Sequence, residues 1–302
     1  MGTVVEELSG AVRGAAEAVG PAVVGVGTGG SGVVVGRGVV VTNAHNLKGG
    51  EVVVTLADGR RVTGRASGVD FEGDLAALAV EGAEGPELAW ATEPAAVGDV
   101  VFGLANPGGR GLRVSVGFVS ATEVAFRGPG GRQVAGAVEH TAPLARGSSG
   151  GPLVDASGRL VGIDTHRIGD GFYLAVPADA EWRRRVEALG RGEQPYRPRL
   201  GIAVAPAPVA KRLRRSVGLA ERDGILVRAV EDGGPAAAAG IREGDLVVAV
   251  GATAVASVDD LAAALEAAGA AEPVAVSVVR GVEELIVTVT LPGPTAGGAE
   301  GG

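Results

Sequence analysis

Between Ala22 and Pro177 the chain consists of short, valine-rich apolar runs separated by turns that contain glycine. Frequent short strands with turn signals between them favour an antiparallel sandwich or barrel over a parallel sheet. The Asp58-Gly59 pair is typical of a tight hairpin turn between two of these runs. We expect two series of strands. The first series covers 22–27, 32–36, 38–42, 51–57, 60–69 and 75–80, and the second covers 99–104, 112–120, 121–127, 132–139, 152–155, 159–165 and 171–176.

Two stretches have helical spacing of their apolar residues instead. Residues 3–19 predict an amphipathic helix that packs on the first strand series and ends at Gly20-Pro21. Residues 178–189 predict a second helix, which is capped by Gly190. Its apolar face is Trp182, Val186 and Leu189, and its solvated face is Arg183, Arg184 and Arg185.

A polar, proline-containing stretch divides the strand-rich region from a second region of mixed character. The second region predicts helices near 208–217, at 234–237 and at 258–268, and strands at 224–230, after 244–247, at 274–280 and at 283–291. We therefore expect an N-terminal helical segment at 1–21, a first domain at 22–190, a linker at 191–198, a second domain at 199–292 and a disordered tail at 293–302.

Composition agrees with two small domains. The chain has 302 residues, of which 46% are hydrophobic and only 3% aromatic, so its cores are built from Val, Ala, Leu and Ile. A formal net charge of −8 argues against nucleic acid as a partner. The absence of cysteine excludes disulfides, thiolate metal sites and cysteine nucleophiles.

Targeting signals are not evident from the sequence. No stretch has the length and apolarity of a membrane span. Residues 1–17 contain Glu6, Glu7 and Glu17 and lack a basic start followed by an apolar run, so we do not expect a signal peptide. This leaves open a cytoplasmic protein or one that lacks its targeting segment.

The stretch Gly147–Pro152 reads Gly-Ser-Ser-Gly-Gly-Pro and carries the strongest chemical signal. A serine flanked by glycines can approach a substrate carbonyl closely, and neighbouring N–H groups can point at one oxygen. His45 follows a valine-rich run, and Asp74 opens another apolar run. The order His, Asp, Ser is that of the chymotrypsin-type triad.

With these motifs the chain resembles the HtrA-type trypsin-like proteases from about Val23 to Pro177. The motifs are Thr42-Asn43-Ala44-His45, Gly73-Asp74-Leu75-Ala76, Ala105-Asn106-Pro107-Gly108 and Gly147-Ser148-Ser149-Gly150-Gly151-Pro152. A second similarity, from about Leu200 to Leu291, is to PDZ domains of the bacterial protease-linked kind. The resemblance implies a mainly β fold, a chymotrypsin-like double six-stranded barrel followed by a small α+β PDZ domain. It also implies a serine endopeptidase for unfolded or exposed polypeptides, mostly acting outside the cytoplasm, with no metal or organic cofactor.

The resemblance assigns roles to the motif residues. Ser149, which directly precedes two glycines, is the nucleophile, and Ser148 is its nearest rival. His45 is the general base, and Asp74 holds its imidazole. The backbone N–H groups of Gly147 and Ser149 form the oxyanion hole. Removal of one such donor typically raises the barrier by ~3 kcal/mol.

Other residues of the same types compete for these roles. His140 is expected as a strand residue, and His166 ends the strand that should line the substrate groove. Neither precedes an aspartate in the required order. Asp70 and Asp99 are the acidic rivals of Asp74, and Asp99 lies in a Gly-Asp turn that indicates a structural role.

The specificity pocket departs from the resembling family. Its predicted residues are Pro143, Leu144, Thr165 and Tyr173. Pro143 and Leu144 should form the floor of the pocket, and both are apolar, which argues against a preference for substrates with Lys or Arg before the cleaved bond. Tyr173 stands where the resembling family has glycine, and its side chain would narrow or plug the pocket. We expect a small aliphatic residue before the cleaved bond. Movement of Tyr173 in an activated state is a further hypothesis.

The PDZ-like domain implies binding of C-terminal peptides by strand addition. By resemblance, Leu200, Gly201 and Ile202 form the carboxylate loop, and Leu261 and Leu265 line the groove, with an ordinary core role equally open for Leu265. The N-terminal segment lacks the aromatic residues that relatives use to form trimers, so a homotrimer is left open.

Two function classes stay open on the sequence alone. Substitutions at residues 143–148 and Tyr173 favour a catalytically weak or inactive, chaperone-like peptide-binding protein, whereas the complete triad favours an enzyme. An esterase of another fold is disfavoured, because Pro152 stands where that fold would begin its helix.

Overall fold

The computed structural model divides the chain into two compact units, residues 1–195 and 196–302. The structure describes residues 3–86, 88–128, 133–169, 171–193, 198–205, 207–269 and 273–292. The predicted tail at 293–302 and residues 194–197 of the predicted linker lie outside these ranges.

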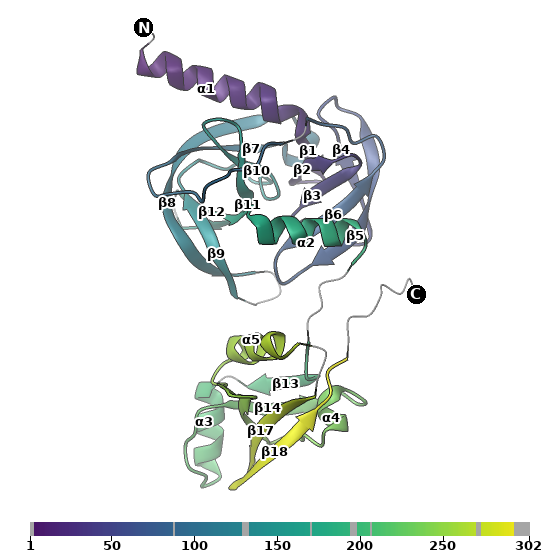
Figure 1. The fold of residues 1–302 in the computed structure, drawn as a ribbon, viewed down its shortest axis with the longest axis vertical. Helices are drawn as coiled ribbons and strands as arrows, with labels where there is room; N and C mark the ends of the chain where they lie inside the picture. The colour runs from purple at the N-terminus through teal and green to yellow at the C-terminus, as the bar shows by residue number, and fades with distance from the viewer. Residues whose placement is uncertain are drawn as a thin grey trace. The chain divides into compact units, whose positions relative to one another are not determined.

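The first strand series closes into a six-stranded barrel in the order β1-β2-β3-β6-β5-β4 (Figure 1). The hairpin turn at Asp58-Gly59 joins β4 to β5, and Gly59 has the positive φ of 87° that such a turn requires. The strands are β1 (Val23–Val26), β2 (Gly30–Gly36), β3 (Val39–Thr42), β4 (Glu51–Thr55), β5 (Arg61–Asp70) and β6 (Leu75–Val80).

The second series closes into another barrel in the order β10-β11-β12-β9-β8-β7. The expected pair of strands at 112–120 and 121–127 is wrong, because one 15-residue strand, β8, covers Arg113–Arg127. Register shifts against β9 and a positive φ of 57° at Glu123 bend this strand without ending it. The other strands are β7 (Val100–Ala105), β9 (Gln133–His140), β10 (Pro152–Asp155), β11 (Leu160–Ile168) and β12 (Phe172–Pro177).

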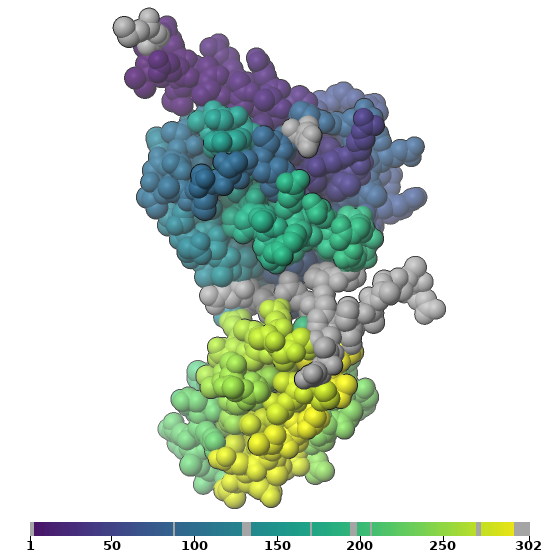
Figure 2. Space-filling model, viewed as in Figure 1, coloured from purple at the N-terminus to yellow at the C-terminus, as the bar shows by residue number. Residues whose placement is uncertain are grey.

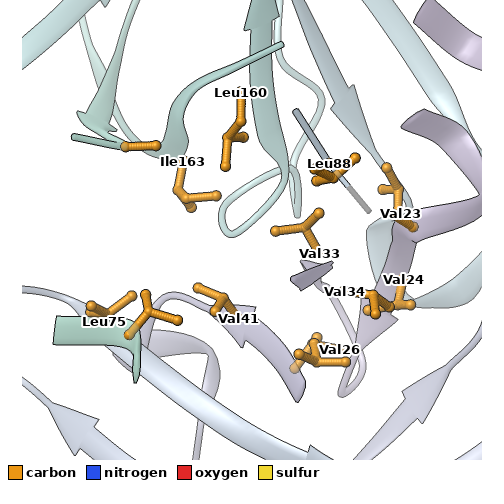
Figure 3. Close-up of a cluster of buried hydrophobic side chains, with 14 of the residues drawn as sticks. Val23, Val24, Val26, Val33, Val34, Val41, Leu75, Leu88, Leu160 and Ile163 are labelled. Carbon is orange, nitrogen blue, oxygen red and sulfur yellow. The ribbon is translucent and has the colours of Figure 1, made fainter. Parts of the chain in front are cut away.

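The main apolar core of the first unit is continuous between its two barrels, and a smaller cluster that includes Leu153 lies within the second barrel. Val33 and Val41 of the first barrel lie in the same cluster as Leu160 and Ile163 of the second (Figure 3). Close packing of short branched side chains holds the two barrels together. The strand ends that carry the candidate triad are therefore supported by a single buried framework.

Helix α1 (Val4–Val19) begins at a capping box, in which Thr3 and Glu6 exchange hydrogen bonds. Only its last turns pack: Ala15 and Val19 are buried, while Val4 and Val5 are exposed. The expected packing on the first strand series is wrong, because α1 contacts β7 and β8 of the second. Its outer turns stand clear of the barrels in Figures 1 and 2.

Helix α2 (Ala180–Gly190) begins at Asp179, whose side chain caps the Trp182 N–H at 2.7 Å. Its apolar face, Trp182, Val186 and Leu189, is buried, and the helix packs on β5 and β6. The expected solvated arginine face is wrong for Arg185, whose guanidinium pairs with the buried Asp70 of β5.

The second unit has one sheet in the order β13-β14-β15-β17-β18, with β16 paired to β15. Leu200, Ile225 and Val276 belong to its separate apolar core. The mainly β prediction, two six-stranded barrels followed by a small α+β domain, is confirmed. The elements are β13 (Ile202–Ala205), α3 (Ala207–Ser216), β14 (Ile225–Val230), α4 (Pro235–Ala238), β15 (Leu246–Val250), β16 (Thr253–Ala254), α5 (Val258–Ala268), β17 (Val274–Arg280) and β18 (Glu283–Val289).

Candidate active site

His45 lies in η2 (Ala44–Asn46), a single 3-10 turn that directly follows β3. Its Nδ1 lies 2.9 Å from each carboxylate oxygen of Asp74, and its backbone N–H donates to Asp74 Oδ1 at 3.1 Å. The side chain keeps about a third of its surface exposed, 31%. The imidazole is therefore held through Nδ1, and Nε2 is left for a reacting partner.

Asp74 occupies the tight turn between β5 and β6, and its φ of 50° is left-handed. This conformation is strained for a residue with a side chain, and such strain is often found at functional sites. The Asn43 amide donates to the Asp74 carbonyl at 3.0 Å. Thr165 Oγ1 donates to Asp74 Oδ2 at 2.6 Å, so the buried carboxylate accepts bonds from both barrels.

Ser149 lies in the loop between β9 and β10. Its Oγ donates to the Thr165 carbonyl at 2.8 Å, so in this conformation the hydroxyl proton is not directed at His45. The Ser149 carbonyl accepts from the Ser31 N–H at 3.0 Å and from Asn46 Nδ2 at 2.9 Å. Asn46 adjoins His45 in the chain, so the histidine turn and the serine loop are joined by a direct hydrogen bond.

The backbone of the serine loop depends on glycine. Gly147 and Gly150 have φ values of 90° and 91°. A Cβ on Gly147 would lie 1.8 Å from the Gly29 carbonyl oxygen, and one on Gly150 would lie 2.1 Å from the Ser31 carbonyl oxygen. No side chain fits at either place. Within the described part of the chain, the N–H groups of Gly147 and Ser149 donate to no acceptor.

The four predicted pocket residues do not share one cavity. Pro143 and Leu144 line a cavity of about 370 Å³ together with Gly103, Ala105, Arg113, Val114, Ser115, Ala145 and Ser148. Thr165 directs its hydroxyl to Asp74, and sequence reasoning missed this contact. Tyr173 is nearly buried, with its ring stacked on His140 at a centroid distance of 5.8 Å.

A fully buried pair, His140 and Asp164, lies behind the serine loop, and the sequence indicated no role for Asp164. His140 Nε2 is 3.1 Å from Asp164 Oδ1, at an angle that does not complete a hydrogen bond. Burial raises the pKa of the Asp164 carboxyl, and the neighbouring His140 opposes this shift. The Asp164 backbone bonds to Gly150 and Gly151 at 2.8 and 2.9 Å, which ties the pair to the serine loop.

The rival residues take other positions. His166 Nδ1 lies 3.0 Å from Thr165 Oγ1, and its ring is 5.9 Å from that of His45. Asp70 accepts from the Gly73 N–H at 3.0 Å, and Asp99 accepts from the Ala96 N–H at 2.8 Å, so both fix turns.

In the second unit, three of the predicted groove residues, Leu200, Gly201 and Ile202, lie at the start of β13. Gly201 has a φ of 73° and directly precedes this edge strand, which pairs only with β14 among the described strands. Leu200, Leu261 and Leu265 are buried in the core of this unit, and Ile202 packs against them. The structure thus brings these residues together, with the two α5 leucines in the core.

Comparison with known proteins agrees with this architecture. Residues 30–163 match the trypsin-like peptidase domain, and residues 198–291 match the PDZ domain. The putative serine protease HhoB of Synechocystis is 31% identical over 283 residues, which cover 89% of this chain and 67% of that protein. A probable periplasmic serine endoprotease, DegP-like, of Brucella suis is 33% identical and covers 86% of this chain, which spans 52% of that relative.

Solved structures show the same fold over both units. The HtrA-type protease AlgW with a decapeptide matches 94% of this chain and 99% of its own, with a TM-score of 0.74 and 25% identity. The serine endoprotease from Yersinia pestis matches 93% and 97%, with a TM-score of 0.70 and 27% identity. Fold and site together define a trypsin-like serine endopeptidase that carries a PDZ domain. More narrowly, the chain belongs to the HtrA family of serine proteases.

Proposed function

We propose that Ser149, His45 and Asp74 are the catalytic residues of this endopeptidase and that its substrates are unfolded or exposed polypeptides. The observation that carries the proposal is the convergence on Asp74, whose carboxylate accepts from His45 Nδ1 and from Thr165 Oγ1 beside the serine loop. The cleft is expected to bind an extended segment of the substrate. Strands within a folded substrate are already hydrogen-bonded to their neighbours, so they cannot enter it.

The reaction begins when the Ser149 hydroxyl leaves the Thr165 carbonyl and turns to Nε2 of His45. Oγ attacks the substrate carbonyl while Nε2 takes the proton, and Asp74 stabilises the imidazolium. The imidazolium then protonates the leaving amine, and the C–N bond breaks. A water molecule, deprotonated by His45, hydrolyses the acyl-enzyme and restores the serine.

The N–H groups of Gly147 and Ser149 are the proposed donors to the oxyanion. Both lack an acceptor within the described residues, so they are available to a developing negative charge. The positive φ of Gly147 and its contact with Gly29 hold this peptide in place.

For the residue before the cleaved bond we propose a small aliphatic side chain. The support is the apolar Leu144, which lines the cavity beside the serine loop, and Tyr173, whose ring is nearly buried against His140. A peptide library dominated by Phe, Lys or Arg at that position would refute the proposal. Faster cleavage by Tyr173→Gly than by the wild type would show that Tyr173 restricts the pocket, and equal turnover would show that it does not.

For the PDZ domain we propose capture of apolar C-terminal peptides along the open edge of β13. Leu200, Gly201 and Ile202 provide the loop for the carboxylate, and β13 provides backbone groups for strand addition. We expect micromolar affinity, about −8 kcal/mol, by calorimetry. A C-terminally amidated peptide that binds equally well would contradict this mode.

The relatives also guide compartment and assembly. The Brucella relative is described as a probable periplasmic protease, which supports an extracytoplasmic location for this protein. Cell fractionation would test this location. No helix among the described residues is long and apolar enough to cross a membrane. Analytical sedimentation would show whether the protein forms a homotrimer in solution.

Labelling with a fluorophosphonate probe tests the catalytic proposal directly. We expect the folded wild type to label at Ser149 and the Ser149→Ala variant not to label. The orientation of the Ser149 hydroxyl toward Thr165 favours the alternative, a catalytically weak, chaperone-like peptide-binding protein. A folded wild type that does not label, with or without a PDZ peptide, would establish that alternative.

A further inference from the structure

The segments around the serine loop are rich in arginine and lack acidic residues. Residues 28–31, 105–115 and 143–149 contain Arg110, Arg113 and Arg146 and not one Asp or Glu. The whole chain has 35 acidic and 27 basic residues, so this local balance is opposite in sign to the protein as a whole.

Tertiary contacts bring these segments together. Arg113 lines the 370 Å³ cavity with Leu144 and Ser148, and Arg146 directly precedes Gly147 in the chain. Arg110 Nη2 donates to the Thr28 carbonyl at 3.4 Å, and the neighbouring Gly29 carbonyl lies against Gly147. Two stretches of backbone, 105–115 and 143–149, thus bring Arg110, Arg113 and Arg146 near the serine loop. We call Arg110, Arg113 and Arg146 the arginine cluster.

The arginine cluster has no acidic partner within the part of the chain that the structure describes. All three residues are exposed, and none forms an ion pair with another described residue. Some other arginines of the first unit do have carboxylate partners: Arg60 pairs with Asp58, Arg65 with Glu51, Arg159 with Asp155 and Arg184 with Glu181. The cluster therefore keeps its positive potential for a ligand.

The two buried carboxylates of the site are occupied by other partners and form no ion pair with the arginine cluster. Asp74 is buried and accepts from His45 and Thr165. Asp164 is fully buried against His140, and burial raises the pKa of its carboxyl, which favours the neutral form. Arginine remains charged at any pH at which the enzyme is folded and binds carboxylates through two parallel N–H donors.

We propose that the arginine cluster selects substrates with Asp or Glu close to the scissile bond, beside the small aliphatic residue. This inference rests on the proposed function of Ser149. Acidic peptides are attracted to the serine loop, and the carboxylate of the substrate completes the ion pairs that the protein leaves open. Because these guanidinium groups are exposed, the preference weakens as salt screens them.

Fluorogenic peptides that differ at one position test the proposal. Glu, Gln and Lys are compared at each of the three positions before and after the cleaved bond, at low and high salt. We expect Glu to exceed Gln in kcat/KM by about five- to thirtyfold at one or more positions at low salt, as two or three exposed ion pairs would give. This ratio should shrink at high salt, and Lys should be the poorest residue.

Substitutions test whether the arginine cluster causes the preference for Glu. We expect the triple variant Arg110→Gln, Arg113→Gln, Arg146→Gln to lose the preference for Glu while it still cleaves the Gln peptide. The control Arg60→Gln, on a hairpin turn with its own partner, should keep the preference. Equal cleavage of Glu and Gln peptides by the wild type, or a triple variant that keeps the preference, would overturn the proposal.

A binding measurement separates this inference from the catalytic proposal. With Ser149→Ala, fluorescence anisotropy should show tighter binding of the Glu peptide than of the Gln peptide, and the triple substitution should remove the difference. Failure of fluorophosphonate labelling would refute the catalytic role and leave this difference intact. Normal labelling with no difference in binding or cleavage would refute the arginine cluster alone.

Discussion

Thr165 connects the two halves of the proposed triad through its own two oxygens. Its hydroxyl donates to Asp74 Oδ2 at 2.6 Å, and its carbonyl accepts from Ser149 Oγ at 2.8 Å. The hydroxyl bond fixes the carboxylate, while the carbonyl bond holds the nucleophile away from the base. One residue thus both orders the site and stabilises its resting arrangement.

Replacement of the Thr165 hydroxyl tests the first of these roles. Thr165→Val keeps the β-branched shape of the strand residue but removes the hydroxyl donor to the buried Asp74 Oδ2, which then has only His45 Nδ1 nearby. A hydrogen bond to a charged group contributes about 1.5–3 kcal/mol, so we expect kcat/KM to fall about ten- to a hundredfold. Thr165→Ser should retain most activity in the same assay. A Val variant as active as the wild type would remove Thr165 from the positioning role.

Asp164 provides a prediction at the same scale, on stability and pH. Burial raises the pKa of its carboxyl above the ordinary value of 3.8, so the folded state keeps a proton that the unfolded state has lost. The free energy of unfolding therefore falls as pH rises through the interval from 3.8 to the raised pKa. The loss is about 1.4 kcal/mol for each pH unit of that interval.

The variant Asp164→Asn removes this titration and keeps a polar group opposite His140. Relative to wild type, its free energy of unfolding should become larger as pH rises above about 4, where the unfolded carboxyl of the wild type ionises. Urea unfolding followed by tryptophan fluorescence measures this difference, because Trp90 and Trp182 both belong to the first unit. A difference that stays constant with pH would contradict the prediction.

At the scale of elements, α2 supports the turn that presents Asp74. Arg185 pairs with Asp70, and Asp70 in turn accepts from the Gly73 N–H at 3.0 Å. The guanidinium lies so close to Gly73 that a Cβ there would be 1.9 Å from it. The turn is therefore held from outside by a helix and from inside by Asn43, which bonds to the Asp74 carbonyl.

Removal of this outer support should affect both stability and catalysis. In Arg185→Ala the nearly buried Asp70 loses a cation, and we expect a loss of about 1–3 kcal/mol, reduced from the value for a fully buried pair because Arg185 is partly exposed. We also expect a several-fold fall in kcat with little change in KM, since Arg185 acts on the turn that carries Asp74.

Arg184→Ala is the matched control on the same helix. Arg184 pairs with Glu181 at the surface, where such a pair contributes less than about 1 kcal/mol. Thermal melts compare the stability of the two variants, and steady-state kinetics compare their kcat and KM. If Arg184→Ala and Arg185→Ala behave alike, the Asp70 contact does not support the turn.

At the scale of the whole molecule, the two units have separate apolar cores. One cluster runs through both barrels and α2, and another lies within residues 200–291. Domains with independent cores unfold as independent cooperative units. The barrels share a core, so we expect them to unfold together.

A thermal scan followed by two probes should therefore detect two transitions. Circular dichroism reports on both units, whereas tryptophan fluorescence reports only on the barrels, because the two tryptophans lie in residues 1–195. We expect fluorescence to follow one of the two transitions seen by circular dichroism. The isolated segment 196–302 should reproduce the other, and a single transition common to both probes would contradict this view.

The linear sequence by itself determined the β architecture and the identity of the candidate triad. Strand alternation and glycine turns are local properties, so they can be read from neighbouring residues, as at Asp58-Gly59. The order of His45, Asp74 and Ser149 within family-like motifs was also visible without coordinates. Errors arose where local patterns were ambiguous, as in β8, whose bends resemble a strand end.

The contacts that orient the site residues could be seen only once the chain was folded. Thr165 and Asp74 are 91 positions apart, and Ser31 and Gly147 are 116 apart, yet each pair is joined by a hydrogen bond. Closure of the barrels creates these neighbours, and no periodicity in the sequence reports them. The resting direction of the Ser149 hydroxyl and the approach of residues 105–115 to the serine loop follow from the same closure, because packing determines which distant backbones touch.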